Sequence, residues 1–192
     1  MKLILITGKT GSGKNKLGDY LCLKNNFKHI DIDKICHTCY ENQKIVEKVK
    51  FYFGNDIIEN NQVNRKKLGA IVFNDKEKMK ILSDLTYNFV IEKIDEIIAN
   101  STTDIVLNYV LLPNTKYWNQ QCFKILVKSD SDDERYKHLV ERDKVSMEYI
   151  LSRDKNSLTY YDQDFDYVFV NDYKEKTLQE NVDKIIKLIA EK

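Results

Sequence analysis

The stretch Gly8-Lys9-Thr10-Gly11-Ser12-Gly13-Lys14-Asn15 decides the fold of this chain. It follows the apolar run Leu3–Ile6 and precedes a stretch, residues 16–24, whose pattern predicts a helix. A glycine-rich turn between a buried strand and a helix is typical of a phosphate-binding loop with the pattern G-x-x-x-x-G-K-[ST]. Glycines let backbone N–H groups face phosphate oxygens, and the helix N-terminus adds partial positive charge. The alternative is a glycine-rich turn without a ligand. The residues predicted to bind the nucleotide are Gly8, Gly11, Ser12, Gly13, Lys14 and Asn15.

Asn15 departs from this pattern, because a Ser or Thr hydroxyl usually occupies its position and binds Mg²⁺. An amide carbonyl is also a hard oxygen ligand, so we expect Asn15 to bind Mg²⁺ more weakly rather than not at all. Lys14 is expected to reach the β- and γ-phosphates. The loop therefore predicts a bound nucleotide with Mg²⁺; the resemblance described below implies that the nucleotide is ATP.

Apolar runs predict parallel strands at residues 2–7, 27–32, 104–109, 122–127 and 167–170, separated by helical stretches. This order, with the glycine-rich loop after the first strand, indicates an α/β protein with a doubly wound, five-stranded parallel sheet; the resemblance described below implies that the sheet is of P-loop kinase type. Residues 34–100 read as almost entirely helical and are too long for a plain crossover, which predicts an inserted helical subdomain. We predict one domain in the 192 residues: a core (about 1–33, 101–128 and 160–192), this subdomain, and a helical lid (about 129–159).

The charge balance limits the partners of the protein. There are 31 basic and 30 acidic residues, a net charge of +1, whereas nucleic-acid and membrane-surface binders carry a basic excess. No apolar run approaches the length of about 18 residues that a membrane span requires. The N-terminus leads directly into a strand and a polar turn, unlike a signal peptide. We expect a cytoplasmic protein that is a monomer or a weak homo-oligomer and binds a small-molecule substrate.

Two features indicate phosphoryl-transfer chemistry. The second predicted strand ends in Asp31-Ile32-Asp33, and ligands bind beyond the carboxyl ends of parallel strands. A carboxylate there can accept a proton from an attacking hydroxyl or hold the water shell of a metal, although Asp also serves as a helix N-cap. Three of the four arginines (Arg135, Arg142 and Arg153) fall within nineteen residues of the predicted lid. This clustering favours a lid that brings arginine to the transferring group; the alternative is a solvated charged helix.

Several short motifs, taken in order, resemble the dephospho-coenzyme A kinase family of the nucleoside-monophosphate-kinase-like P-loop group. After the loop come Asp31-Ile32-Asp33-Lys34-Ile35-Cys36-His37, Phe53-Gly54, Asn64-Arg65, Leu111-Leu112, Glu141-Arg142-Asp143 and Asp166-Tyr167-Val168-Phe169-Val170-Asn171. The resemblance implies ATP-dependent phosphorylation of the ribose 3′-hydroxyl of dephospho-coenzyme A, the last step of coenzyme A biosynthesis. It implies that Asp33 orients or deprotonates that hydroxyl, that Arg142 stabilises charge on the phosphoryl group, and that Asn171 lies near adenine. The residues that it implies for acceptor binding are Asp31, Asp33, His37 and Arg65.

The chain departs from the family pattern on both the metal side and the acceptor side. Asn15 replaces a hydroxyl residue, Thr86-Tyr87 stands where His-Pro is usual, and Val110 replaces the proline before Leu111-Leu112. His138 stands where an arginine is common in the lid. Two alternatives to a dephospho-coenzyme A kinase therefore stay open: a P-loop kinase of another nucleoside or nucleotide, and a nucleotide-binding protein that has lost catalysis.

Overall fold

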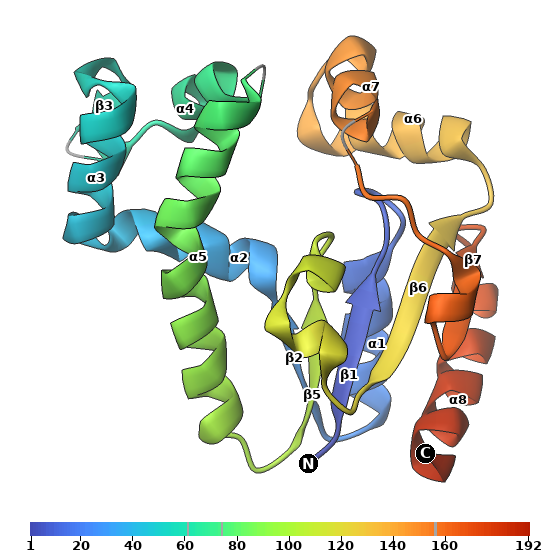
Figure 1. The fold of residues 1–192 in the computed structure, drawn as a ribbon. Coiled ribbons are helices and arrows are strands. Elements are labelled where there is room, and N and C mark those ends of the chain that lie inside the picture. Colours follow the sequence, from blue (N-terminus) through green and yellow to red (C-terminus); the bar gives the residue numbers. More distant parts are fainter. Residues whose placement is uncertain (61, 74, 156) are drawn as a thin grey trace. The chain divides into compact units, whose positions relative to one another are not determined.

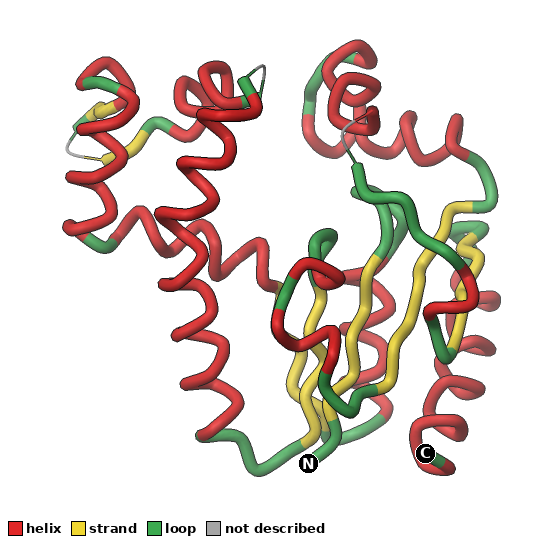
Figure 2. The backbone as a smooth tube through the Cα atoms, viewed as in Figure 1, coloured by secondary structure: helices red, strands yellow, loops and turns green. Residues whose placement is uncertain are grey.

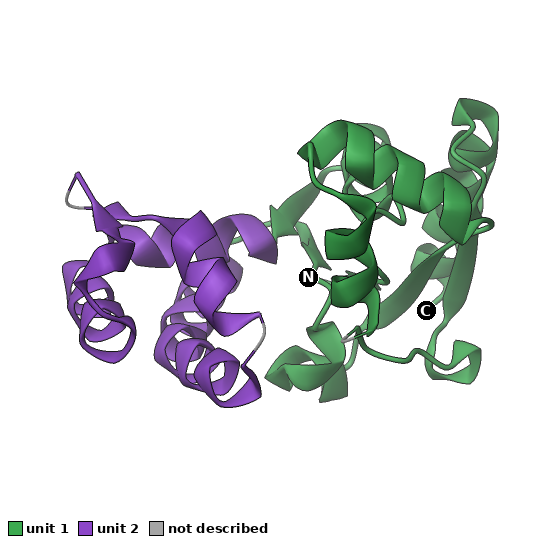
Figure 3. Cartoon of the chain, turned by 90° about the horizontal axis from the view of Figure 1, so that it is seen from above, with its two compact units in different colours: residues 1–31, 101–192 green, residues 32–100 purple. Residues whose placement is uncertain are grey.

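The computed structural model of the protein describes residues 1–60, 62–73, 75–155 and 157–192. The chain separates into two units, which Figure 3 colours separately. Unit 1 comprises residues 1–31 and 101–192, and unit 2 comprises residues 32–100.

Unit 1 is built on a parallel sheet. Within the described ranges the sheet has five strands in the order β2-β5-β1-β6-β7, and each neighbouring pair is parallel, which confirms the predicted sheet (Figures 1 and 2). β2 ends at Asp31, so the prediction that Ile32 continues this strand was wrong; Ile32 begins a helix of unit 2. The bounds are β1 (Leu3–Thr7), β2 (Phe27–Asp31), β5 (Asp104–Asn108), β6 (Phe123–Ser129) and β7 (Tyr167–Asn171).

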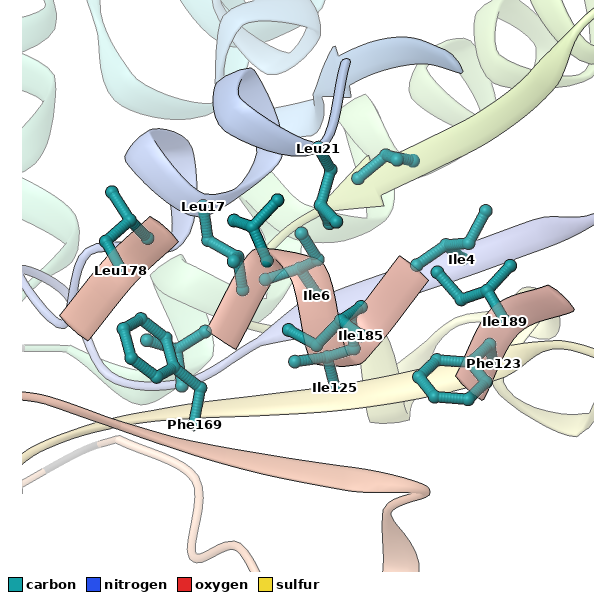
Figure 4. Packing of buried hydrophobic residues seen from close by; sticks show 13 residues of the cluster. Ile4, Ile6, Leu17, Leu21, Phe123, Ile125, Phe169, Leu178, Ile185 and Ile189 are labelled. Atoms are coloured by element: carbon teal, nitrogen blue, oxygen red, sulfur yellow. The ribbon is translucent and has the colours of Figure 1, made fainter. Parts of the chain in front are cut away.

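One face of this sheet packs against α1 (Lys14–Lys24) and α8 (Glu175–Glu191). Side chains alternate between the faces of a strand, so Ile4 and Ile6 of β1 point to these helices while Leu3 and Leu5 point away. Figure 4 shows Leu17 and Leu21 of α1 meeting the strand residues, with α8 alongside. Full burial of one such side chain stabilises the fold by about 1.5–3 kcal/mol. This core holds the end of β1 and the start of α1, and therefore both anchors of the glycine-rich loop.

The rest of unit 1 consists of short helices. α6 (Asp132–Asp143) begins where Ser131 accepts a hydrogen bond from the Glu134 N–H at 3.3 Å, and its first turn is acidic, as a helix N-terminus favours. α7 (Met147–Lys155) follows α6. The 3₁₀ turns η3 (Leu112–Asn114) and η4 (Lys116–Asn119) lie on the sheet face opposite α1 (Figure 1), and η5 (Asp162–Asp164) precedes β7.

Unit 2 is mainly helical, with one short hairpin. Polar residues start three of its helices: the side chains of Asn42, Asn64 and Asp75 each accept two backbone N–H groups. Gly54, with φ +91°, ends one of them. The prediction that residues 34–100 are almost entirely helical missed the antiparallel pair β3 (Ile58–Glu59) and β4 (Gln62–Val63). The helices are α2 (Ile32–Thr38), α3 (Gln43–Phe53), α4 (Arg65–Val72) and α5 (Lys76–Ala99), with 3₁₀ turns η1 (Cys39–Glu41) and η2 (Asn55–Ile57).

No helix among the described residues combines the length and apolar character needed to cross a membrane.

Candidate active site

The stretch Gly8–Asn15 forms the turn from β1 into α1 at the carboxyl end of the sheet, and its last two residues begin α1. Gly8 has φ +141° and Gly13 has φ +101°, values that side chains disfavour. A Cβ atom on Gly8 would overlap the carbonyl oxygen of Val127, and one on Gly13 would overlap the side-chain nitrogen of Asn171. The loop therefore favours glycine at both positions, most strictly at Gly8, where the obstructing atom belongs to the backbone.

The start of α1 is suited to bind an anion. The helix begins at Lys14, two residues before the predicted start, and Gly13 precedes it without a side chain that could accept the first N–H groups. The first turn carries no acidic residue. Lys14 is 7% exposed, and its ammonium donates to the Lys9 carbonyl at 2.9 Å, across the loop. Helix N–H groups and a lysine at one turn provide the donors that a polyphosphate needs.

Asn15 lies in a small polar cluster at the ends of β2 and β5. Its amide nitrogen donates to the Asp31 carboxylate at 2.8 Å, and its carbonyl oxygen accepts a hydrogen bond from the Asn108 amide. Asn108 is 1% exposed, and its own carbonyl oxygen has no partner among the described residues. A buried acceptor without a donor is costly, which favours a bound water or cation beside it.

These oxygens fit Mg²⁺ chemically. Mg²⁺ binds hard oxygen ligands and in kinases takes one or two carboxylates together with phosphates and water. Asp31 supplies a carboxylate, while Asn15 and Asn108 supply amide oxygens. The described residues contain no group of three or more His, Cys, Asp or Glu side chains able to hold a metal, and such a site requires none. The sequence prediction missed Asn108, although a polar residue at the end of the run Ile105–Leu107 is a usable signal.

Asn171 holds the loop. Its amide nitrogen donates to the Ser12 carbonyl at 2.9 Å, and its oxygen accepts the Tyr173 N–H at 3.0 Å. The residue is 7% exposed. Both ends of the amide therefore have protein partners, and the adenine-contacting role stays a prediction.

Of the arginines in α6, the buried one contacts the loop. Arg135 has a fully buried side chain, donates to the Thr10 carbonyl at 2.9 Å, and forms a two-point ion pair with Asp154 of α7. Arg142, which was predicted to act on the phosphoryl group, is 62% exposed and pairs with its neighbour Asp143 at 2.6 Å. The sequence predicted that both arginines belong to the lid, but it does not indicate which one is buried. The partner that buries Arg135, Asp154, is 19 residues away in the chain, so no local pattern reveals the pair.

Burial and charge act against each other in the Arg135–Asp154 pair. Burial raises the pKa of Asp154, but the hydrogen bonds and charge of Arg135, with Tyr136 and Lys9, lower that pKa below its ordinary value overall. Burial likewise lowers the pKa of Arg135, and Asp154 and Asp132 raise it above its ordinary value. Both groups are therefore charged at neutral pH.

The remaining predicted residues belong to unit 2. Asp33 lies in the first turn of α2 rather than at a strand end. His37 and Arg65 line one pocket of about 410 Å³ together with Tyr40, Glu41 and Gln43. Burial raises the pKa of Tyr40, while the charge of Arg65 lowers it, so the phenol stays neutral. A cation, a neutral phenol and a histidine in one pocket can bind an anionic or hydroxyl-bearing ligand.

Comparison with known proteins identifies the family. A family model for dephospho-CoA kinase matches residues 2–176. The chain belongs to the dephospho-CoA kinase family. Dephospho-CoA kinases from Fusobacterium nucleatum and Helicobacter pylori are 33% and 29% identical to it, over 76% and 97% of this chain and 76% and 96% of theirs. Members of this family are phosphotransferases, and the recognition made from the ordered motifs is confirmed.

Solved structures agree on the fold. A Thermus thermophilus protein superimposes with a TM-score of 0.81 at 22% identity, covering 97% of this chain and 96% of its own. Dephospho-CoA kinase from Campylobacter jejuni gives a TM-score of 0.66 at 24% identity, covering 100% and 98%. The predicted P-loop kinase fold is thus confirmed.

Proposed function

We propose that this protein transfers the γ-phosphoryl group of ATP to the ribose 3′-hydroxyl of dephospho-coenzyme A, giving coenzyme A. The observation that carries the proposal is the Gly8–Asn15 loop, whose glycines adopt positive φ and whose helix N-terminus and Lys14 offer donors to a polyphosphate. Family membership supports the choice of acceptor.

On the nucleotide side, the loop N–H groups and Lys14 would bind the β- and γ-phosphates. Asp31, Asn15 and Asn108 would hold Mg²⁺, directly or through water. A bound Mg²⁺ supplies charge neutralisation at the phosphate oxygens. The protein then contributes mainly positioning and fixed charge, since phosphoryl transfer requires little covalent chemistry from side chains.

On the acceptor side, Asp33 would accept the proton of the attacking hydroxyl, while His37 and Arg65 would bind the substrate in the unit 2 pocket. Arg142 would stabilise the transferring phosphoryl group. Its pairing with Asp143 does not prevent this role, because an ion pair on an exposed side chain is worth at most about 1 kcal/mol and exchanges readily. Arg135 cannot take this role while its guanidinium is buried against Asp154.

The decisive experiment measures ADP release from Mg-ATP with and without dephospho-coenzyme A, and identifies the product by mass. Acceptor-dependent ADP and a product heavier by one phosphoryl group would support the proposal. If other nucleosides or nucleotides serve better in an acceptor panel, the acceptor assignment is wrong. If ATP raises the unfolding temperature but no acceptor yields ADP, the protein binds nucleotide without catalysis.

We infer in addition that the protein works in the cytoplasm as a monomer or weak homo-oligomer. The near balance of 31 basic and 30 acidic residues favours neither a nucleic-acid nor a membrane-surface partner, which is in keeping with an enzyme that acts on a small molecule. Sedimentation velocity across a concentration series tests the oligomeric state.

A further inference from the structure

Three successive carbonyl groups of the glycine-rich loop accept hydrogen bonds from side chains. The Thr10 carbonyl accepts from the Arg135 guanidinium at 2.9 Å. The Gly11 carbonyl accepts from the Tyr173 hydroxyl at 3.1 Å, and the Ser12 carbonyl accepts from the Asn171 amide at 2.9 Å. In the chain the donors lie more than 120 residues from the loop, so only the folded unit brings them together.

These contacts set the orientation of the loop peptides whose N–H groups would bind phosphate. A trans peptide directs its N–H opposite to its carbonyl. Holding the carbonyls of Thr10, Gly11 and Ser12 therefore also sets the direction of the N–H groups of Gly11, Ser12 and Gly13. The Ser12 N–H donates to the Lys9 carbonyl at 3.2 Å, so the contact to the Gly11 carbonyl also fixes the tight turn Lys9–Ser12 inside the loop. Donors that are already oriented need not be ordered when the anion binds, which improves affinity.

Tyr173 is the unusual member of this set. Its φ of +61° lies in the left-handed region, which a bulky aromatic residue rarely occupies. Four contacts hold it there: its N–H donates to the Asn171 side chain, its hydroxyl donates to the Gly11 carbonyl and lies 2.9 Å from Ser129 Oγ, and its ring centroid lies 4.5 Å from that of His138. Strained residues that persist are concentrated at functional sites, and this one contacts the loop directly.

We propose that Tyr173 is a positioning residue of the phosphate-binding loop: its hydroxyl holds the Gly11 carbonyl and with it the Lys9–Ser12 turn, so that the loop backbone is preformed for the polyphosphate of ATP. Arg135 and Asn171 hold the adjoining carbonyls. The inference rests on the proposed ATP-binding function, but it assigns to Tyr173 a role that is separate from the identity of the acceptor.

Tyr173→Phe tests this inference, because it removes the hydroxyl and keeps the ring against His138. Tyr167→Phe is the matched control: it removes a hydroxyl of the same kind from β7, where it donates to Asn181 at 2.6 Å, away from the loop. Isothermal titration with Mg-ATP, thermal unfolding without ligand, and KM values for both substrates are measured for each protein.

For Tyr173→Phe we expect ATP affinity to fall about three- to tenfold, the effect of losing one hydrogen bond. The KM for ATP should rise in parallel, while the KM for dephospho-coenzyme A stays within about twofold. Tyr167→Phe should lower the unfolding temperature comparably and leave ATP affinity unchanged. Tyr173→Asn, whose side chain tolerates positive φ but is too short to keep the phenol's contact, should bind ATP at least as weakly as Tyr173→Phe.

Equal ATP affinity in Tyr173→Phe and the unmodified protein would overturn the inference. So would equal losses of affinity in Tyr173→Phe and Tyr167→Phe, because the effect would then follow stability alone. If the unmodified protein itself fails to bind Mg-ATP, the proposed function falls and this inference falls with it.

Discussion

Replacing Asp154 by Asn should destabilise unit 1 more than any surface charge removal. Asp154 is 13% exposed and Arg135 is 1% exposed, and the guanidinium bonds both oxygens of this carboxylate. Breaking a buried ion pair from one side costs about 3–5 kcal/mol, since it leaves a buried charge uncompensated. Asn keeps one acceptor, and Asp132 still accepts from Arg135 at 2.9 Å. We therefore expect a loss of about 2–3 kcal/mol, below that range because compensation is partial.

Urea unfolding followed by tryptophan fluorescence measures this loss. The single tryptophan, Trp118, reports on the unfolding of unit 1, which also contains the ion pair. Urea is the suitable denaturant because it is uncharged and does not weaken the ion pair by screening. In thermal unfolding the expected decrease is roughly 4–12 °C, at about 2–4 °C per kcal/mol for a chain of this size.

The pH dependence gives a second test of the same pair. The folded-state pKa of Asp154 lies below its ordinary value, so the stabilisation exists above the unfolded pKa of about 4 and is lost as pH falls through the folded pKa. The stability difference between the unmodified protein and Asp154→Asn should therefore shrink below about pH 4.

Asp183→Asn is the matched control for Asp154→Asn. It removes the Lys24–Asp183 pair, which lies at 2.7 Å with side chains 45% and 55% exposed, and should cost less than about 1 kcal/mol. If Asp154→Asn destabilises no more than this control, or if its effect is equally large at low and neutral pH, the reasoning about the buried pair is wrong.

Three further predictions concern the proposed catalytic and nucleotide sites. Asp33→Asn should lower kcat by about 10²- to 10⁴-fold with ATP affinity nearly unchanged, and undiminished turnover would exclude Asp33 as the base. Asn15→Ser should raise Mg²⁺ affinity or activity in a Mg²⁺ titration, since it restores the usual hydroxyl ligand. If neither rises, Asn15 or a water molecule already acts as a competent Mg²⁺ ligand at this position. Gly8→Ala should reduce both stability and ATP binding, because the new Cβ overlaps the Val127 carbonyl. Gly54→Ala, whose new Cβ meets no atom within 4 Å although Gly54 also has a positive φ (+91°), should cost only about 1–3 kcal/mol from backbone strain and should not alter ATP affinity.

The fold could be predicted from the sequence because its signals are local. The central strands β1 and β5 are buried along nearly their whole length and therefore appear as short apolar runs, such as Ile105–Leu107, whereas the edge strand β2 is only partly buried and carries polar residues. The boundaries were less certain where a residue suits either state, as at Ile32, which begins α2 instead of ending β2. The two-residue strands β3 and β4 carry no periodic pattern long enough to detect.

Some residues of the candidate site could likewise be predicted from a local pattern, and others could not. The glycines, Lys14 and Asn15 stand in one short stretch, so their spacing alone predicts a phosphate-binding loop. The partners of that loop cannot be found in this way. Asn108 reaches Asn15 from a neighbouring strand, and the choice between Arg135 and Arg142 depends on which face of α6 packs inward.

The sequence alone predicted where this protein turns from strand to helix and that the turn is of the phosphate-binding type, because the spacing of Gly8, Gly13 and Lys14 after a short apolar run is a local pattern. Only the tertiary structure decided which side chains hold the turn in shape. Arg135, Asn171 and Tyr173 reach it from α6 and from the end of β7, and a hydrogen bond between residues so far apart in the chain exists only after the sheet has brought their elements together.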